Sequence, residues 1–261
     1  TISNYKDKKN LFESKAWIKP PVYTNLVLNN LDFLDVNKND VIKKLVPINS
    51  ELNIIIKSDN KKFSVLSYDE EIPINNKGNN NYQIKLLMEH NQSITIYKNK
   101  EYYKRWFFNI IADKMPTIEF LSNPSEVNQV ALTFVSRSID DYGLQTVKVK
   151  ITRPNIYKHF EEDYLSYNLP IEEGFNVNNK IVDSYFYQNL SNIIWAGNDA
   201  QLIIKATDLV GQVSSISTKI KIPRKEFKDE VAQKIMKIRD GIAIKKINLD
   251  EAKKSLLVLW E

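Results

Sequence analysis

The chain has 261 residues, of which 43% are hydrophobic and 11% aromatic, and this is enough apolar material for one large domain or two ordinary ones. Cysteine is absent, which excludes disulfides, thiolate nucleophiles and sulfur-ligated metal sites. No run of about 18 apolar residues is present to span a membrane, and the net charge of +5 is spread along the chain, so we expect no nucleic-acid partner.

The first half of the chain predicts a lead-in and a β-sandwich. Residues 1–15 are polar and predict a frayed lead-in. From residue 16 to residue 113, short segments rich in Val, Ile, Tyr and Phe alternate with clusters of Asn, Asp, Pro and Gly, which is typical of an immunoglobulin-like sandwich. The expected strands are Leu52–Lys57, Phe63–Tyr68, Tyr82–Met88, Ser93–Tyr97 and Trp106–Ala112. We expect a turn over 75–78, and a hairpin that joins Tyr82–Met88 to Ser93–Tyr97.

A second sandwich is predicted over residues 114–223. The linker around Pro116 interrupts the strand pattern because proline lacks an amide donor and restricts the residue before it. After it the pattern starts again, and Leu144–Ile151 alternates apolar and polar residues with period two. The expected strands are Ile118–Leu121, Val130–Ser136, Leu144–Ile151, Gln201–Ala206 and Ser214–Ile222. Turns are expected at Asp140–Gly143 and Asp208–Gly211.

An aromatic-rich insertion is predicted inside the second sandwich, over residues 154–197. A solvated loop rarely carries so many rings. Our main interpretation is that most of them cover the sandwich or form further strands, and the alternative is a carbohydrate- or peptidoglycan-binding platform. The rings are Tyr157, Phe160, Tyr164, Tyr167, Phe175, Tyr185, Phe186, Tyr187 and Trp195.

A helical tail is predicted over residues 224–261. Apolar residues recur there at helical spacing, and we expect this stripe to be buried: Phe227, Val231, Ile235, Ile238 and Ile242. Asn248 and Glu251 match a capping box that would begin a second helix. The sequence stops inside that helix, so we expect the tail to be truncated and the chain to be a piece of a longer protein.

Few residues suggest catalysis, and we expect a protein that is not an enzyme. The two histidines, His90 and His159, are isolated, and no nucleophile elbow or phosphate-binding loop is present. A hydrolase is the second alternative. A glycosidase, for example, needs two carboxylates that face each other across the substrate. Acidic clusters at 69–71, 161–163 and 172–173 would have to supply them, although adjacent acidic residues are usually solvated.

Four aspartates form the candidate metal site. Asp140, Asp141 and Asp208 lie in turns that a sandwich of this type places at one pole, and Asp113 lies in the linker that would enter there. Carboxylate oxygens are the ligands that Ca²⁺ prefers, so calcium is the candidate ion. The alternative is that each aspartate only stabilises its own turn through backbone hydrogen bonds. No other cofactor is expected.

Several short motifs follow one another in a fixed order along the chain. They cover about residues 16–261. The matching stretches are Ala16–Thr24, Val46–Pro47 with Ser50, Asp113–Ile118, Asp140–Leu144, Trp195–Gly197, Ala206–Asp208 with Gly211–Gln212, and Ile222–Arg224 with Phe227. In this order the stretches resemble an alphaproteobacterial envelope family, the domain-of-unknown-function family 4175. The chain departs from that family in being far richer in Lys and Asn.

The resemblance implies a place and a fold but no reaction. Members of that family resemble long proteins with transmembrane helices before this region and a long helical region after it. The chain would then be the periplasmic middle part of such a protein, anchored to the inner membrane by segments outside this sequence. Together with the lack of catalytic motifs, this predicts a structural or interaction module of the cell envelope whose partners are other envelope proteins.

Overall fold

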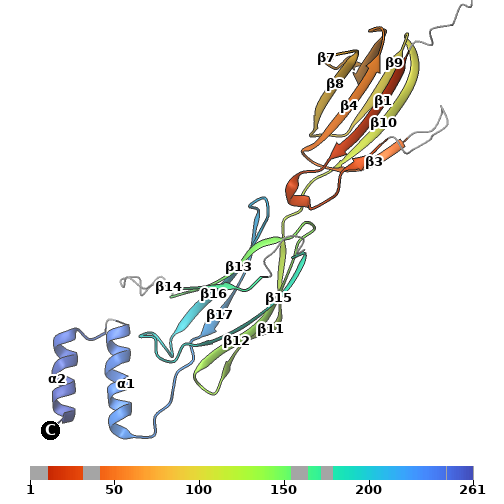
Figure 1. Ribbon diagram of the computed structural model, residues 1–261. Helices are drawn as coiled ribbons and strands as arrows, with labels where there is room; N and C mark the ends of the chain where they lie inside the picture. Colours follow the sequence, from red (N-terminus) through yellow and green to blue (C-terminus); the bar gives the residue numbers. More distant parts are fainter. Residues whose placement is uncertain (1–10, 32–41, 154–163, 172–178, 245, 261) are drawn as a thin grey trace, which may run out of the picture. The chain divides into compact units, whose positions relative to one another are not determined.

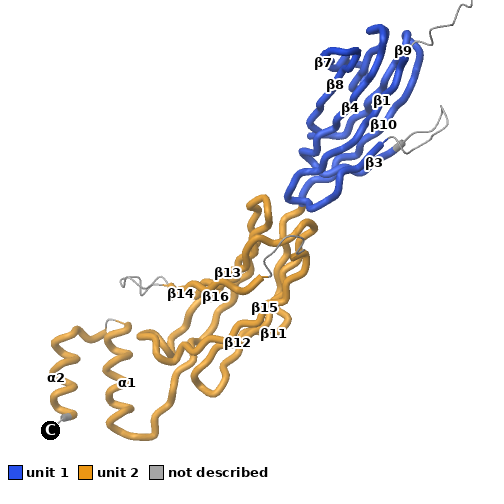
Figure 2. The backbone as a smooth tube through the Cα atoms, in the orientation of Figure 1, with its two compact units in different colours: residues 1–113 blue, residues 114–261 orange. Residues whose placement is uncertain are grey.

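A computed structural model describes residues 11–31, 42–153, 164–171, 179–244 and 246–260. The chain divides into two compact units, Thr1–Asp113 and Lys114–Glu261, which Figure 2 colours blue and orange. Both are β-sandwiches, and two helices follow the last strand (Figure 1). The predicted fold class, mainly β with two immunoglobulin-like sandwiches and a C-terminal helical tail, is confirmed.

The first unit packs two five-stranded sheets face to face. One sheet has the order β2 (Asn29–Asn30), β1 (Phe12–Lys19), β4 (Ser50–Ser58), β8 (Asn81–Met88) and β7 (Asn75–Gly78). The other has the order β3 (Ile42–Pro47), β10 (Glu101–Ile111), β9 (Gln92–Lys98), β5 (Phe63–Ser67) and β6 (Glu70–Glu71). A short 3₁₀ helix, Val22–Thr24, follows β1. Trp106 and Phe108 of β10 lie in the core between the sheets, with Ile54 and Ile84 of the facing sheet.

Three expectations for the first unit are wrong. The lead-in is shorter than residues 1–15, because β1 begins at Phe12 and pairs with β4 from that residue onward. Residues 75–78 are strand β7 rather than a turn. The expected hairpin also does not form, because β8 pairs with β4 and β7 while β9 pairs with β10 and β5. Both strands have inward-facing apolar residues, and the chain crosses between the sheets to bury them from opposite sides.

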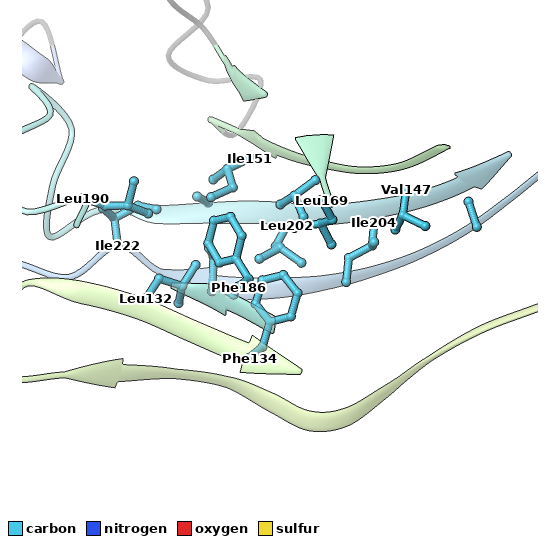
Figure 3. Packing of buried hydrophobic residues seen from close by; sticks show 14 of the residues in the cluster. Leu132, Phe134, Val147, Ile151, Leu169, Phe186, Leu190, Leu202, Ile204 and Ile222 are labelled. Carbon is cyan, nitrogen blue, oxygen red and sulfur yellow. The ribbon is translucent and has the colours of Figure 1, made fainter. Parts of the chain in front are cut away.

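The second unit packs a three-stranded sheet against a four-stranded one. The first has the order β11 (Thr117–Val127), β12 (Ala131–Ile139) and β15 (Ile181–Asn189). The second has the order β14 (Tyr164–Leu169), β13 (Leu144–Thr152), β16 (Asp199–Asp208) and β17 (Val213–Lys221). Figure 3 shows the core between them, where Phe134 and Phe186 of the smaller sheet meet Leu202 and Ile204 of the larger one.

The aromatic-rich region is part of this sandwich rather than an insertion. Its strand β15 pairs with β12 in unbroken register from Ile139↔Ile181 to Ala131↔Asn189, and its strand β14 pairs with β13. Phe186 and Trp195 are buried in the core. Tyr157, Phe160 and Phe175 lie outside the described residues.

Asparagine-rich turns connect several neighbouring strands. Two consecutive residues have positive φ at Asn79–Asn80, at Asn99–Lys100 and at Asn128–Gln129. This conformation matches the right-handed twist of a hairpin, and asparagine adopts it more readily than most residues. The many asparagines therefore have a structural use at the β7–β8, β9–β10 and β11–β12 connections.

The tail forms two helices, α1 (Glu230–Ala243) and α2 (Leu249–Trp260). The predicted capping box is confirmed, because Asn248 Oδ1 accepts from the Glu251 amide at 2.8 Å and Glu251 Oε2 accepts from the Asn248 amide at 3.0 Å. Asp229 caps α1 by accepting from the Ala232 amide at 2.8 Å. Gly241 allows the helices to approach, since a Cβ there would lie 2.9 Å from the Ile247 side chain.

The expectation of a buried stripe on α1 is wrong. Phe227, Val231 and Ile235 are 37%, 46% and 45% exposed. The end of α1 is instead held to the sandwich by polar contacts. Arg224 Nη1 lies 2.6 Å from Asp240 Oδ2, and buried Arg153 donates from Nη2 to the Ala243 carbonyl at 2.8 Å. Helix ends leave carbonyls without intrahelical partners, and an arginine satisfies one of them here.

Candidate functional site

The outer side of β12 and β15 carries an exposed aromatic and aliphatic surface. We call it the tyrosine face, and it comprises Val135, Arg137, Ile139, Ile181, Asp183, Tyr185 and Tyr187. Tyr185 and Tyr187 are 65% and 52% exposed, and Ile181 is 62% exposed. Because side chains alternate across a strand, Val182, Ser184 and Phe186 point into the core and leave their neighbours outside.

An ion pair lies in the middle of the tyrosine face. Arg137 donates from Nε to Asp183 Oδ1 and from Nη2 to Asp183 Oδ2, both at 2.7 Å. Hydrogen bonds from Arg137 lower the pKa of Asp183, and the same contact raises the pKa of Arg137. The two residues are opposite one another on neighbouring strands. The forked geometry fixes both side chains on an otherwise aromatic and aliphatic surface.

Two turns of the second unit meet at one end of the sandwich and bring three aspartates together. We call Asp140, Asp141 and Asp208 the aspartate pole. Leu144 of β13 pairs with Asp208 of β16, and a Cβ on Gly143 would lie 3.7 Å from Leu209 Cδ1. The turns therefore pack against each other, as the sequence argument expected for these three residues.

Two of these aspartates cap their own turns. Asp140 Oδ2 accepts from the amides of Tyr142 and Gly143 at 2.9 and 2.6 Å. Asp208 Oδ1 accepts from the amides of Val210 and Gln212 at 2.9 and 2.8 Å. Both side chains are buried, with Asp140 5% and Asp208 1% exposed. Turn capping, the alternative interpretation, therefore accounts for the hydrogen bonds of one oxygen in each of these two carboxylates.

Burial is the main influence on the charge of Asp140 and raises its pKa. The backbone hydrogen bonds from Gly143 and Tyr142 act in the opposite direction, and the negative charges of Asp141 and Asp208 add to the increase. A buried carboxylate close to two others is costly to ionise because water solvates it poorly and like charges repel. The ionised form of Asp140 is therefore less favourable in the fold than in water.

We expect Asp140→Asn to stabilise the metal-free second unit at pH 7. Asparagine can still accept the two turn hydrogen bonds, and it removes a charge whose ionisation is unfavourable in the fold. A raised folded pKa means that the native state holds its proton more tightly, so stability from this group falls as pH rises from about 3.9, the unfolded value, through the folded value. The advantage of the variant should therefore shrink as the pH is lowered from 7 to 4.

Thermal melts of both proteins in a chelating buffer at several pH values would measure this difference. Asp199→Asn, at an exposed position at the start of β16, is the control. A melting-point difference between Asp140→Asn and the natural chain that does not change with pH would contradict the expectation.

The sequence also singled out Asp113, two histidines and three acidic clusters. Asp113 is the last residue of the first unit, so a calcium site shared by all four aspartates stays a prediction. Across the described ranges, no group of three or more His, Cys, Asp or Glu side chains is arranged to hold a metal ion. His90 and the acidic residues 69–71 are exposed, while His159 and the clusters at 161–163 and 172–173 lie outside the described residues.

A known protein family matches nearly the whole chain. A family model described as a domain of unknown function, DUF4175, matches residues 3–259. The chain belongs to the DUF4175 family. The resemblance inferred from the ordered motifs is therefore confirmed at the level of the family. No curated protein matches this DUF4175 chain.

Several solved structures are similar to the DUF4175 chain at low scores. Fibronectin(III)-like modules of Clostridium thermocellum CbhA give a TM-score of 0.28 at 11% identity, covering 74% of this chain and 97% of theirs. A DUF3823 family protein from Bacteroides ovatus gives 0.30 at 11% identity, covering 65% and 91%. The I9–I11 tandem of titin gives 0.27 at 11%, covering 72% and 65%. The sandwich architecture of the DUF4175 chain is established by its own strand order.

The tyrosine face of the DUF4175 chain was only partly anticipated. Tyr185 and Tyr187 belonged to the predicted aromatic region, but Arg137 and Asp183 were not singled out. The available signal was the alternation in β15, IVDSYFYQN, which places one set of side chains inside and the other outside. The partner strand could not be deduced from that pattern, so the ion pair with β12 was not predictable.

Proposed function

We propose that this DUF4175 chain is a non-catalytic interaction module of a bacterial cell-envelope protein, and that it binds another envelope protein through the tyrosine face. One observation carries the proposal: two exposed tyrosines and two exposed isoleucines surround a bidentate arginine–aspartate pair on one sheet. A group of large apolar side chains exposed on one surface is typical of a protein interaction site.

The chemistry of the tyrosine face favours a protein partner. Tyrosine and arginine are enriched among the residues that dominate binding energy, because they bury a large area and lose little conformational freedom. Tyr185 and Tyr187 stand on the same side of one strand, about 7 Å apart from the rise per residue. Ile139 and Ile181 extend the surface with aliphatic groups, which suit protein side chains better than hydroxylated sugars.

A carbohydrate or peptidoglycan ligand is the second candidate. It is favoured by one observation, the two exposed phenol rings at alternate positions of β15, which offer apolar surfaces for sugar rings. The hydrolase alternative has less support, since the acidic residues 69–71 are exposed and Asp140 and Asp208 are engaged in capping turns. The family and the sandwich fold are consistent with a module that is not an enzyme.

The proposed location is the periplasm, where the module would be tethered to the inner membrane by segments outside this sequence. No helix among the described residues is long and apolar enough to cross a membrane. The proposal of an anchored protein comes from the family resemblance, in which transmembrane helices precede this region.

Replacing both tyrosines should reduce partner binding about tenfold or more, because residues of this kind commonly contribute about 2 kcal/mol when they occupy the centre of an interface. The experiment places a photo-crosslinking phenylalanine analogue at Ile181 of the full-length parent protein. The yield of protein adducts in the envelope is then compared with and without Tyr185→Ala and Tyr187→Ala. Tyr164→Ala, 53% exposed on the other sheet, is the matched control.

Co-sedimentation with purified peptidoglycan separates the two candidates. Loss of the protein adduct in the double variant, with no sedimentation of either protein, supports a protein partner. If the natural protein sediments with peptidoglycan and the double variant does not, the tyrosine face binds glycan instead. Equal adduct yields from the double variant and from Tyr164→Ala would overturn the proposed face.

A further inference from the structure

We propose that the aspartate pole of the second unit binds a calcium ion between Asp140 and Asp208. This proposal does not depend on the tyrosine face or on the function proposed for it. The site uses only aspartates of a single unit, and each carboxylate both caps a turn and binds the ion.

In each of the two carboxylates, one oxygen caps a turn and the other is available to a cation. One oxygen of each residue, Asp140 Oδ2 and Asp208 Oδ1, accepts two backbone hydrogen bonds and holds a turn. The other oxygens, Asp140 Oδ1 and Asp208 Oδ2, are buried and have no hydrogen-bond partner among the described residues, and the same is true of Asp141 Oδ1. Turn capping does not explain these second oxygens.

Three buried serines lie on the inner side of β12 and β15, and Ser138 is the one close to the pole. Ser136, Ser138 and Ser184 are 0%, 0% and 2% exposed, and in the described part of the chain their hydroxyls have no hydrogen-bond partner. Ser138 precedes Asp140 by two residues and shares its inward direction, and Ser136 pairs with Ser184 on the next strand. A buried polar group without a partner is unfavourable, so the unpartnered hydroxyl of Ser138 makes the core polar beside Asp140.

The donor atoms indicate which cation would bind. Every unpartnered atom at the pole is an oxygen, and calcium accepts six to eight oxygens from carboxylates, neutral groups and water. Magnesium demands a smaller and more regular octahedron. The described residues supply two capping carboxylates and no complete set of three acidic ligands, so neutral oxygens would complete the shell. The affinity should therefore be weak, with Kd on the order of 10⁻⁴–10⁻³ M.

The charges around the pole agree with a bound cation. The carboxylates of Asp141 and Asp208 lie close enough to Asp140 for like charges to repel. Lys180 is the nearby basic residue, with its ammonium 5.8 Å from the centre of the Tyr142 ring, and no ion pair joins it to these aspartates in the described ranges. A divalent ion would offset the repulsion that the described side chains leave in place.

The test is a titration of the metal-free 261-residue chain with calcium chloride, followed by calorimetry and by the melting temperature. We expect a saturable heat and a rise in melting temperature by mass action. Asp208→Asn should abolish both effects, because asparagine keeps an oxygen for the Val210 and Gln212 amides but removes the anionic second oxygen. Asp140→Asn is the second variant of the same design, and Asp199→Asn is the matched control that should bind normally.

Terbium luminescence supplies a local readout, since Tyr142 lies beside Asp141 and can sensitise a lanthanide bound at the pole. Luminescence that calcium displaces from the natural chain, but that is lost in both asparagine variants, supports the site. The absence of heat and of any thermal shift at millimolar calcium would overturn it. Equal responses from the natural chain and the two variants, or from calcium and magnesium, would also overturn it, because they would show only screening of surface charge.

Discussion

Phe134→Ala should destabilise the second unit by about 3–5 kcal/mol, the usual cost of removing a buried phenylalanine. Phe134 is 1% exposed. Its ring stacks on that of Phe186 (Figure 3), with centroids 4.7 Å apart. It also meets Phe120 edge to face at 5.7 Å. The change removes both ring contacts and leaves a cavity between two sheets whose backbones are tied by hydrogen-bonded ladders and cannot close around it.

Amide hydrogen exchange measured by mass spectrometry would check this result, because it reports the opening free energy of each segment. Slowly exchanging amides of β12, β13 and β16 should lose protection. Val135→Ala, on the opposite side of the same strand, is the control and should cost about 1 kcal/mol or less. If Phe134→Ala were as mild as Val135→Ala, the ring would not be the centre of this core.

Trp106→Ala should have an effect of similar size, about 3–5 kcal/mol, confined to the first unit. Trp106 is 0% exposed in the core of that unit. Its indole Nε1 has no hydrogen-bond partner in the part of the chain that is described, so the substitution breaks no hydrogen bond there and the loss comes from packing. Because each unit has its own core, the amides of β12 and β16 should keep their protection.

The same exchange experiment on Trp106→Ala tests the boundary at Asp113. Phe107→Ala is the control, since Phe107 points to the outer side of β10 and is only partly buried. Equal loss of protection in both units would show that they unfold as one, which would contradict two folding units divided near Pro116. Protection lost only between Phe12 and Ile111 would support the division.

Local patterns in the sequence were sufficient to predict most strands and the helix start. The alternation of Leu144–Ile151 predicted β13 because a half-buried strand must place every second side chain inside. The capping box at Asn248 and Glu251 was predictable because both partners lie within one helical turn. These features depend on residues a few positions apart, and the information is contained in the local sequence.

Strand pairing could not be predicted in the same way. β8 and β9 are neighbours in the sequence and carry suitable apolar residues, but they belong to different sheets. β3 pairs in parallel with β10, which lies far along the chain. Inward-facing residues show that a strand has a buried side, but they do not identify its neighbour, because many partners bury a similar area.

The helical tail also shows that local sequence patterns do not predict tertiary contacts. The spacing of Phe227, Val231 and Ile235 predicted one face of a helix, and an apolar face is normally buried. In the structure these residues remain exposed, and α1 is held through Arg224 and Arg153 near its C-terminal end. Periodicity indicates which residues share a face, whereas burial depends on the contacts that the rest of the unit offers.

The sequence by itself determined the family, the two sandwiches and the helices, because alternation, turn residues and the order of motifs can be read along the chain. The meeting of Asp140 with Asp208 was expected from the pole at which a sandwich of this type places its turns. Only the tertiary structure decided which strands are neighbours, and with them the tyrosine face, the Arg137–Asp183 pair and the unpartnered second oxygens of the aspartate pole. Each of these features depends on atoms from strands far apart in the sequence. Their distances are set when the two sheets of a unit pack around one core.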